Sequence, residues 1–88
     1  MFVHIGGTTV IQAKEIIAIF NIDVQSTSPV TEQFLQRAKK AGQVEVIDTD
    51  ETKSVVITEN RIFYSPISSL TLKRRSDESH QNRVGDPI

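Results

Sequence analysis

"FVHIGGTTVIQAKEIIAIFNI", residues 2–22, holds three apolar runs separated by a glycine pair and by a short polar segment. The run at 2–5 is aromatic and β-branched, and the two glycines after it tolerate the positive φ angles of a tight turn. These features predict a strand, a hairpin turn and a returning antiparallel strand at 8–12. The run at 16–22 is too short and too rich in β-formers to favour a helix, so we expect a third strand there.

This third strand is almost continuously apolar, since "IIAIF" at 16–20 contains no polar residue. Strands that are buried on both faces have this character, whereas half-exposed strands alternate between apolar and polar residues. We therefore expect a helix to cover one face of the strand, and the rest of the fold or a partner to cover the other.

A helix is predicted at 29–41, where the local signals agree. Ser28 can cap it, and Pro29 suits the first helical position because its missing N–H costs nothing there. Two lysines occupy the last turn, and Gly42 is placed to end the helix. The apolar residues that fall on one stripe at helical spacing are Val30, Phe34, Leu35 and Ala38. We expect this stripe to be buried.

The second half of the chain predicts more strands and a short helix. Residues 44–48 and 53–58 are expected to form a hairpin around the acidic turn 49–52, followed by a strand at 61–65. Pro66 cannot donate to a sheet, so it ends that strand.

Ser68 or Ser69 can then cap a short helix that runs to Arg75. From Ser76 onward the sequence has one isolated Val and no periodicity, which predicts a disordered tail over 76–88. The fold class is therefore α+β, with a small, mostly antiparallel β-sheet, one main amphipathic helix and a short C-terminal helix in a single domain of residues 1–75.

Length, charge and cysteine content limit what this domain can be. A chain of 88 residues buries only about 60 to 65% of its unfolded surface, so it is marginal alone and a closed homo-oligomer is the expected remedy. With no cysteine, a secreted disulfide scaffold is excluded and a reducing cytoplasm fits. No apolar run approaches the length of a membrane span, so we expect a soluble, unprocessed protein.

Residues with catalytic or ligand chemistry are few. His4 and His80 have no metal-ligand spacing, and we expect no metal, no cofactor, no small-molecule substrate and no enzymatic activity. The acids Asp48, Asp50 and Glu51 lack the spacing of a calcium loop and are better explained as a solvated turn. Phe63 and Tyr64 could stack on bases, although core packing is the better interpretation.

The cations form three groups, which are Lys14, Lys53 and the run Lys73, Arg74 and Arg75. A terminal basic run usually complements the negative end of a helix dipole. The functional alternative is contact with phosphates, for which adjacent Lys and Arg supply charge and forked donors. The formal net charge is −1, and residues 1–75 contain nine cations and eight anions. Net charge alone therefore does not decide between a helix end and a phosphate-binding surface.

The segments "FVHIGGTTVIQAKEIIAIFNI", "SPVTEQFLQRAKKAG", "KSVVIT" and "IFYSPISSLTLKRR" together resemble the RemA/RemB family of bacterial extracellular matrix regulators, and its RemB branch most closely. The resemblance covers residues 1–75. It implies a DNA-binding transcriptional regulator of biofilm matrix genes, built as a homo-oligomeric ring. The residues expected to contact duplex DNA are Lys14 and Lys53, which lie in stretches that the family would use, and the run Lys73, Arg74 and Arg75, which is the densest basic group of this sequence.

The chain departs from the RemA branch at two places. That branch has an arginine in the stretch matching "AKEII" and an arginine pair in the turn matching "TDETKSVV", where this chain has Lys14 beside Glu15 and has Asp50 and Glu51 before Lys53. Two functions are therefore expected as alternatives. The first is a ring that binds DNA through phosphates, and the second is an oligomeric module that regulates through another protein.

Overall fold

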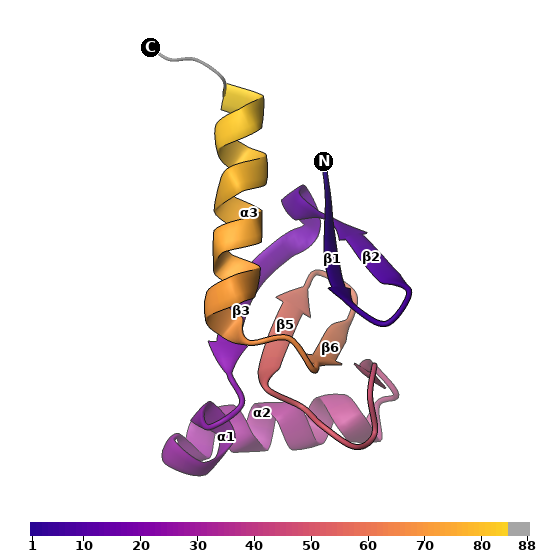
Figure 1. The fold of residues 1–88 in the computed structure, drawn as a ribbon. Coiled ribbons are helices and arrows are strands. Elements are labelled where there is room, and N and C mark those ends of the chain that lie inside the picture. The colour runs from indigo at the N-terminus through magenta and orange to yellow at the C-terminus, as the bar shows by residue number, and fades with distance from the viewer. Residues whose placement is uncertain (85–88) are drawn as a thin grey trace.

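The computed structural model describes the backbone of residues 1–84 and the side chains of residues 1–77. Within residues 1–84, six strands, one 3-10 turn and three helices follow one another (Figure 1). The elements are β1 (Phe2–Gly6), β2 (Thr9–Gln12), η1 (Ala13–Glu15), β3 (Ile16–Asn21), α1 (Val24–Thr27), α2 (Pro29–Lys40), β4 (Val44–Val46), β5 (Ser54–Thr58), β6 (Ile62–Ser65) and α3 (Ser69–Val84). The predicted α+β class is confirmed.

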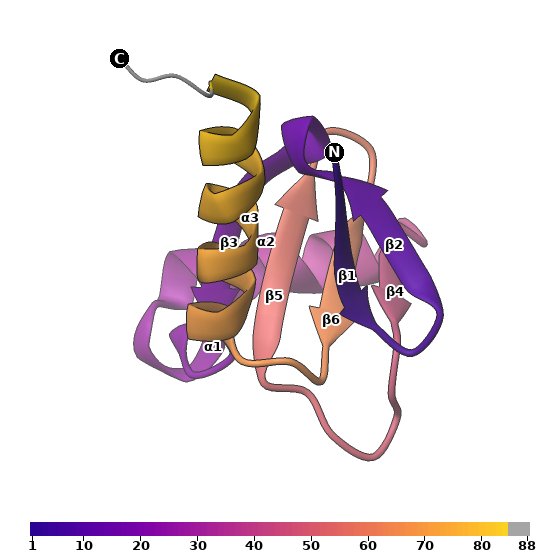
Figure 2. The ribbon, with the colours of Figure 1, turned by 45° about the horizontal axis from the view of Figure 1, so that its top comes forward.

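The strands form two sheets, a β1–β2 hairpin and a four-stranded sheet in the order β3-β5-β6-β4. All pairs are antiparallel except β4 with β6, which is parallel. Helix α2 lies across one face of the larger sheet, and the hairpin and α3 lie on the other face (Figures 1 and 2). No helix in the described part of the chain is long and apolar enough to cross a membrane.

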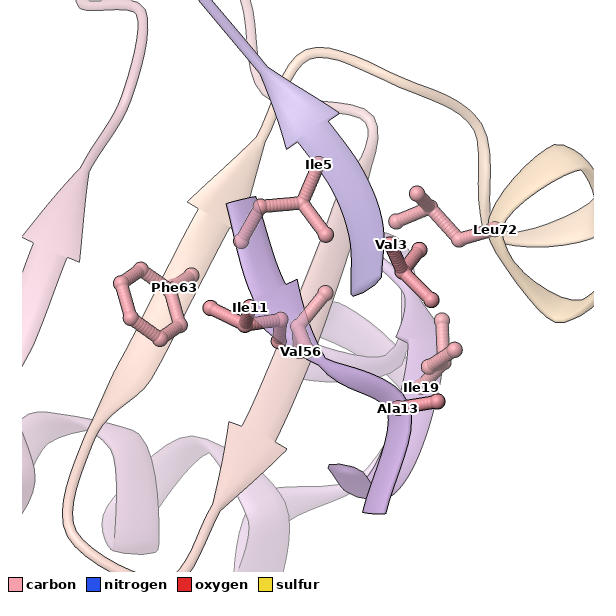
Figure 3. Packing of buried hydrophobic residues seen from close by; sticks show 8 residues of the cluster. All are labelled: Val3, Ile5, Ile11, Ala13, Ile19, Val56, Phe63 and Leu72. Carbon is pink, nitrogen blue, oxygen red and sulfur yellow. The ribbon is translucent and has the colours of Figure 1, made fainter. Parts of the chain in front are cut away.

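Each face of the larger sheet has its own apolar cluster. On the hairpin face, Figure 3 shows side chains from β1, β2, the sheet and α3 in contact. Its members are Val3, Ile5, Ile11, Ala13, Ile19, Val56, Phe63 and Leu72. The cluster beneath α2 consists of Leu35, Ala38, Val55, Ile62 and Tyr64. The buried positions of Phe63 and Tyr64 confirm core packing in place of a base-stacking surface.

The predicted hairpin of residues 44–48 with 53–58 is wrong, because β4 pairs with β6 and not with β5. The physical reason is loop length. Only three residues separate β5 from β6, and both the amide and the hydroxyl of Thr58 donate to the Arg61 carbonyl across that turn, at 2.9 and 2.8 Å. Closing this short loop costs less chain entropy than closing the longer one after β4, so β6 takes the place beside β5.

Helix α2 begins and ends as predicted. The Ser28 hydroxyl accepts a hydrogen bond from the Thr31 amide at 3.3 Å, Pro29 is the first helical residue, and Gly42 beyond the helix has a φ of 74°. The predicted stripe is only partly right, however. Leu35 and Ala38 are buried, whereas Val30 is 78% exposed and Phe34 is 49% exposed. The helix meets the sheet through a contact narrower than the apolar stripe, so two of its four residues lie outside that contact.

Strand β3 is likewise less buried than its sequence predicts. Ile19 is buried, but Ile17 is 64% exposed and Phe20 is 38% exposed. The reason is that β3 lies at the edge of the sheet, with β5 as its one strand neighbour among the described residues. The described residues of one chain therefore do not bury both faces of β3.

Helix α3 starts at the predicted place and ends later than predicted. The Ser68 hydroxyl accepts from the Thr71 amide at 3.2 Å, as an N-cap does. The helix then continues to Val84, so the predicted end at Arg75 is wrong, as is the absence of structure over 76–84; residues 85–88 lie outside the described part. Once a helix is nucleated, each further residue adds a hydrogen bond at low cost, and residues 76–84 contain neither Gly nor Pro to stop it.

Candidate nucleic-acid interface

The two single lysines of the predicted DNA-binding set lie far apart. Lys14 is on η1, just before Ile16, which pairs with Thr58 at the C-terminal end of β5. Lys53 directly precedes the N-terminal end of β5. The five residues of β5, at about 3.3 Å each, separate these two ends by roughly 15 Å. The structure therefore does not bring Lys14 and Lys53 together.

Helix α3 carries the remaining cations along the region between those two ends. Its start is tied to the Lys53 end, because the Ser54 hydroxyl donates to the Ile67 carbonyl at 2.7 Å. Farther along, α3 contacts β1, β3 and η1, and η1 carries Lys14. Figure 1 shows α3 rising alongside β3 in this direction. The predicted cations thus follow one another in a row from the Lys53 end of the domain, through α3, to the Lys14 end.

Arg75 differs from its two neighbours in the basic run. Its guanidinium donates to the His4 carbonyl at 2.8 Å, and its side chain is half-buried between α3 and β1. Leu72 and Ser76 are buried on the same side of the helix. Lys73 and Arg74 are exposed and point away from this contact. Arg75 therefore helps to hold the helix on the domain, and Lys73 and Arg74 are the cations of the run that are free to meet a ligand.

We expect Arg75→Ala to lower the free energy of unfolding by about 1 kcal/mol, since it removes one intramolecular hydrogen bond and the packing of the side-chain stem. Arg74→Ala is the matched control and should change it by less than about 0.5 kcal/mol, because that side chain is exposed. Urea-induced unfolding followed by circular dichroism measures both. Equal effects of the two variants would contradict the anchoring role of Arg75.

Acidic groups accompany both outer lysines. Lys14 shares a shallow hollow of about 290 Å³ with Glu15 and Glu59. The Lys53 ammonium lies 3.8 Å from the Glu51 carboxylate, and both side chains are exposed. Neighbouring carboxylates lower the positive potential that a phosphate meets. Lys14 and Lys53 are therefore weaker phosphate contacts than their charge alone indicates.

The acidic segment between β4 and β5 is an exposed loop rather than a hairpin tip. A carboxylate oxygen of Asp48 accepts the Asp50 amide at 2.9 Å, which is the local turn that aspartates favour. Asp50 and Glu51 are exposed. The loop places negative charge next to Lys53, at the end of the domain where α3 begins.

A second basic surface was not recognised as a candidate from the sequence. Arg37, Lys39 and Lys40 are exposed in the last turn of α2, on the sheet face opposite to α3. The Lys39 ammonium lies 4.9 Å from the centre of the Tyr64 ring, a cation–π distance. The signal was present as "RAKK" at 37–40, but the helix-dipole explanation accounted for it.

Comparison with known proteins places these features in a family. The sequence model of the RemA-like family, described as extracellular matrix regulatory protein A-like, matches residues 2–75. Extracellular matrix regulatory protein B of Bacillus subtilis (strain 168) is 38% identical over 76 residues, which cover 86% of this chain and 90% of that protein. The matched region includes all six strands, helix α2 and the basic run at the start of α3. The chain therefore belongs to the RemA/RemB family of extracellular matrix regulatory proteins, in its RemB branch.

Proposed function

We propose that the protein regulates extracellular matrix genes by binding duplex DNA as a homo-oligomeric ring in the cytoplasm, and that it acts through binding rather than catalysis. The family and the Bacillus subtilis relative are both named as regulators of the extracellular matrix. The observation that carries the DNA-binding part is the exposure of Lys73 and Arg74 on a helix that is fixed to the domain by Leu72 and Arg75. A fixed helix presents its cations without a large cost in ordering entropy.

The near-neutral charge of the chain makes each subunit a weak phosphate binder. A ring repeats the same pair of cations at a fixed spacing, so the second and later contacts occur at an effective concentration of about the millimolar range. Lys14 and Lys53 extend the row at its two ends, where Glu15 and Glu51 reduce their contribution. Binding should therefore depend strongly on the length of the DNA.

Fluorescence anisotropy with a long labelled duplex at about 50 mM salt, followed by a salt series, tests this proposal. If phosphate contacts dominate, the logarithm of the binding constant falls with the logarithm of salt concentration by about 0.9 for each phosphate neutralised. We expect the double variant Lys73→Ala/Arg74→Ala to weaken binding for all sequences alike and to flatten this slope. Short duplexes should bind poorly.

The matched control is Arg37→Ala/Lys40→Ala, which removes the same two residue types from the opposite face of the sheet. It should leave the affinity and the salt slope unchanged. A variant with arginines at the exposed acids, Asp50→Arg/Glu51→Arg, should bind more tightly than the natural chain. Absence of binding to the long duplex, or equal losses in the two double alanine variants, would contradict the proposed interface.

The second candidate function is regulation through contact with another protein. The exposed acids Asp50 and Glu51 favour it, because they repel phosphate and offer a charged loop to a basic protein surface. An oligomer that shows no DNA binding in the anisotropy experiment supports this alternative.

A further inference from the structure

Strand β3 is an edge strand of the larger sheet, and helix α3 contacts it on the hairpin face. Natural proteins protect exposed strand edges with charged residues, prolines or bulges, because the unpaired N–H and C=O groups of an edge recruit further strands. The six residues of β3, "IIAIFN", include no charge and no proline. Its one irregularity is a bulge between Ile16 and Ala18, and the pairing from Ala18 to Asn21 is regular. Among the described residues, no strand pairs with its outer side.

Exposed apolar side chains occur on β3 and on the helix that follows it. Ile17 and Phe20 are exposed on β3 itself, and Val30 and Phe34 are exposed on α2. The first turns of α2 follow β3 through the short α1 segment and lie at the same end of the sheet, as both ribbon views show (Figures 1 and 2). We call these four residues the β3 patch. All four were predicted to be buried, and the structure leaves them exposed.

The opposite edge of the same sheet also carries an exposed apolar residue, Val46, on the same face as Phe20. Phe20 pairs with Val55, Val55 pairs with Tyr64, and Tyr64 pairs with Val46 of β4, so a single row of residues crosses all four strands. Directly paired residues point to one face of a sheet. The two inner members of the row are buried, whereas Phe20 and Val46, its two ends, are partly exposed.

We propose that subunits of the ring join edge to edge, with the open side of β3 in one copy pairing with the open side of β4 in the next. This inference rests on the ring in the proposed function and names its contact surface. The join continues the cross-sheet row, since it places Val46 of one copy beside Phe20 of the other, on the face of the sheet that α2 covers and where Phe34 is exposed. Strands β3 and β4 run in the same direction within the sheet, so the new pair is parallel.

A second copy is the occupant that fits both edges at once. A strand edge is satisfied by another strand, and each chain supplies two unpaired edges whose apolar residues lie on one face. Pairing β3 with β3 of a partner would close a dimer and leave both β4 edges open. Pairing β3 with β4 uses both edges of the four-stranded sheet, and repetition of that head-to-tail contact closes into a ring when the rotation between subunits allows it.

Light scattering coupled to size-exclusion chromatography tests the contact on the full chain with edge-blocking variants. Phe20→Lys blocks the β3 edge, and Ile17→Lys blocks it at a more exposed position, at 64% against 38% exposure, in case the former does not fold. Val46→Lys blocks the β4 edge. Each variant alone should elute with the mass of one subunit, while circular dichroism retains the fold.

The decisive sample is a mixture of a β3 variant with Val46→Lys. Each of these chains keeps one intact edge, so the mixture should contain a dimer with one copy of each and no larger species. Val10→Lys is the matched control, because Val10 is 50% exposed against 45% for Val46 and lies on β2, outside both edges. It should retain the mass of the natural assembly.

Two failures are distinguishable. If the natural chain is a monomer at micromolar concentration, both the ring and the edge contact are wrong. If the natural chain is an oligomer and Val46→Lys keeps its mass, the ring stands and the head-to-tail contact is overturned. DNA binding is measured separately on the natural chain, so its absence would contradict the proposed function without bearing on the edge contact.

Discussion

Gly6→Ala is expected to lower the free energy of unfolding by about 2 to 6 kcal/mol, a large fraction of the roughly 5 to 15 kcal/mol that stabilises a small domain. Two costs combine. Gly6 has a φ of 130°, a conformation that residues with a side chain rarely adopt. A Cβ atom there would also lie 2.8 Å from Cδ of Pro66, which belongs to a rigid ring and cannot rotate away.

This close approach joins two turns that lie in the first and last of the segments resembling the RemA/RemB family. The Ser65 hydroxyl donates to the Ile5 carbonyl and accepts the Ile67 amide at 3.0 Å, so Ser65 connects the turn that contains Pro66 to the strand that ends at Gly6. The glycine turn after β1 and the "YSPIS" turn after β6 therefore form one contact between the hairpin and the main sheet. Any added volume at Gly6 must separate them.

Gly42→Ala is the matched control for Gly6→Ala. Its φ is also positive, at 74°, but nothing lies within 4 Å of a Cβ built at Gly42. It should therefore carry a backbone cost of about 1 to 2 kcal/mol without the steric one. Urea-induced unfolding of both variants gives the difference. Equal losses would show that the contact with Pro66 is unimportant.

The elements that the sequence predicted well have their signals within a few residues. Ser28, Pro29 and Gly42 define the ends of α2 by local hydrogen bonding and φ preference, and the glycine pair defines the first hairpin. Sheet order is different, because it depends on which loop closes at least cost. The strand at β4 was predicted correctly, but its pairing with β6 was not.

The candidate site shows the same division. Exposure of Lys73 and Arg74 follows from their polarity, but the contact of Arg75 with His4 joins residues that are 71 positions apart, and no local pattern reports it. The length of α3 was missed because its polar residues beyond Arg75 resemble a tail in composition, whereas helix propagation depends on the absence of Gly and Pro.

Leu35→Ala and Phe34→Ala should differ in their effect on stability, because Leu35 belongs to the buried part of the apolar stripe on α2 and Phe34 to the exposed part. Leu35 is buried between α2 and the sheet, in contact with the cluster that contains Val55 and Tyr64. Its truncation should cost about 2 to 5 kcal/mol, through lost transfer free energy and the cavity that remains. Phe34 keeps about half of its surface in water, so its truncation should cost only about 1 kcal/mol within the subunit.

The dependence on protein concentration gives the sharper distinction between these variants. Leu35 acts inside one chain, so the loss caused by Leu35→Ala should be the same in dilute and concentrated protein. Phe34 belongs to the β3 patch, so Phe34→Ala should lose additional stability only at concentrations where subunits associate, because binding between folded subunits stabilises them by mass action. Urea-induced unfolding at two concentrations measures both. A concentration-independent loss of several kcal/mol in Phe34→Ala would show that the ring of Phe34 is buried within its own subunit after all, and would remove it from the subunit contact.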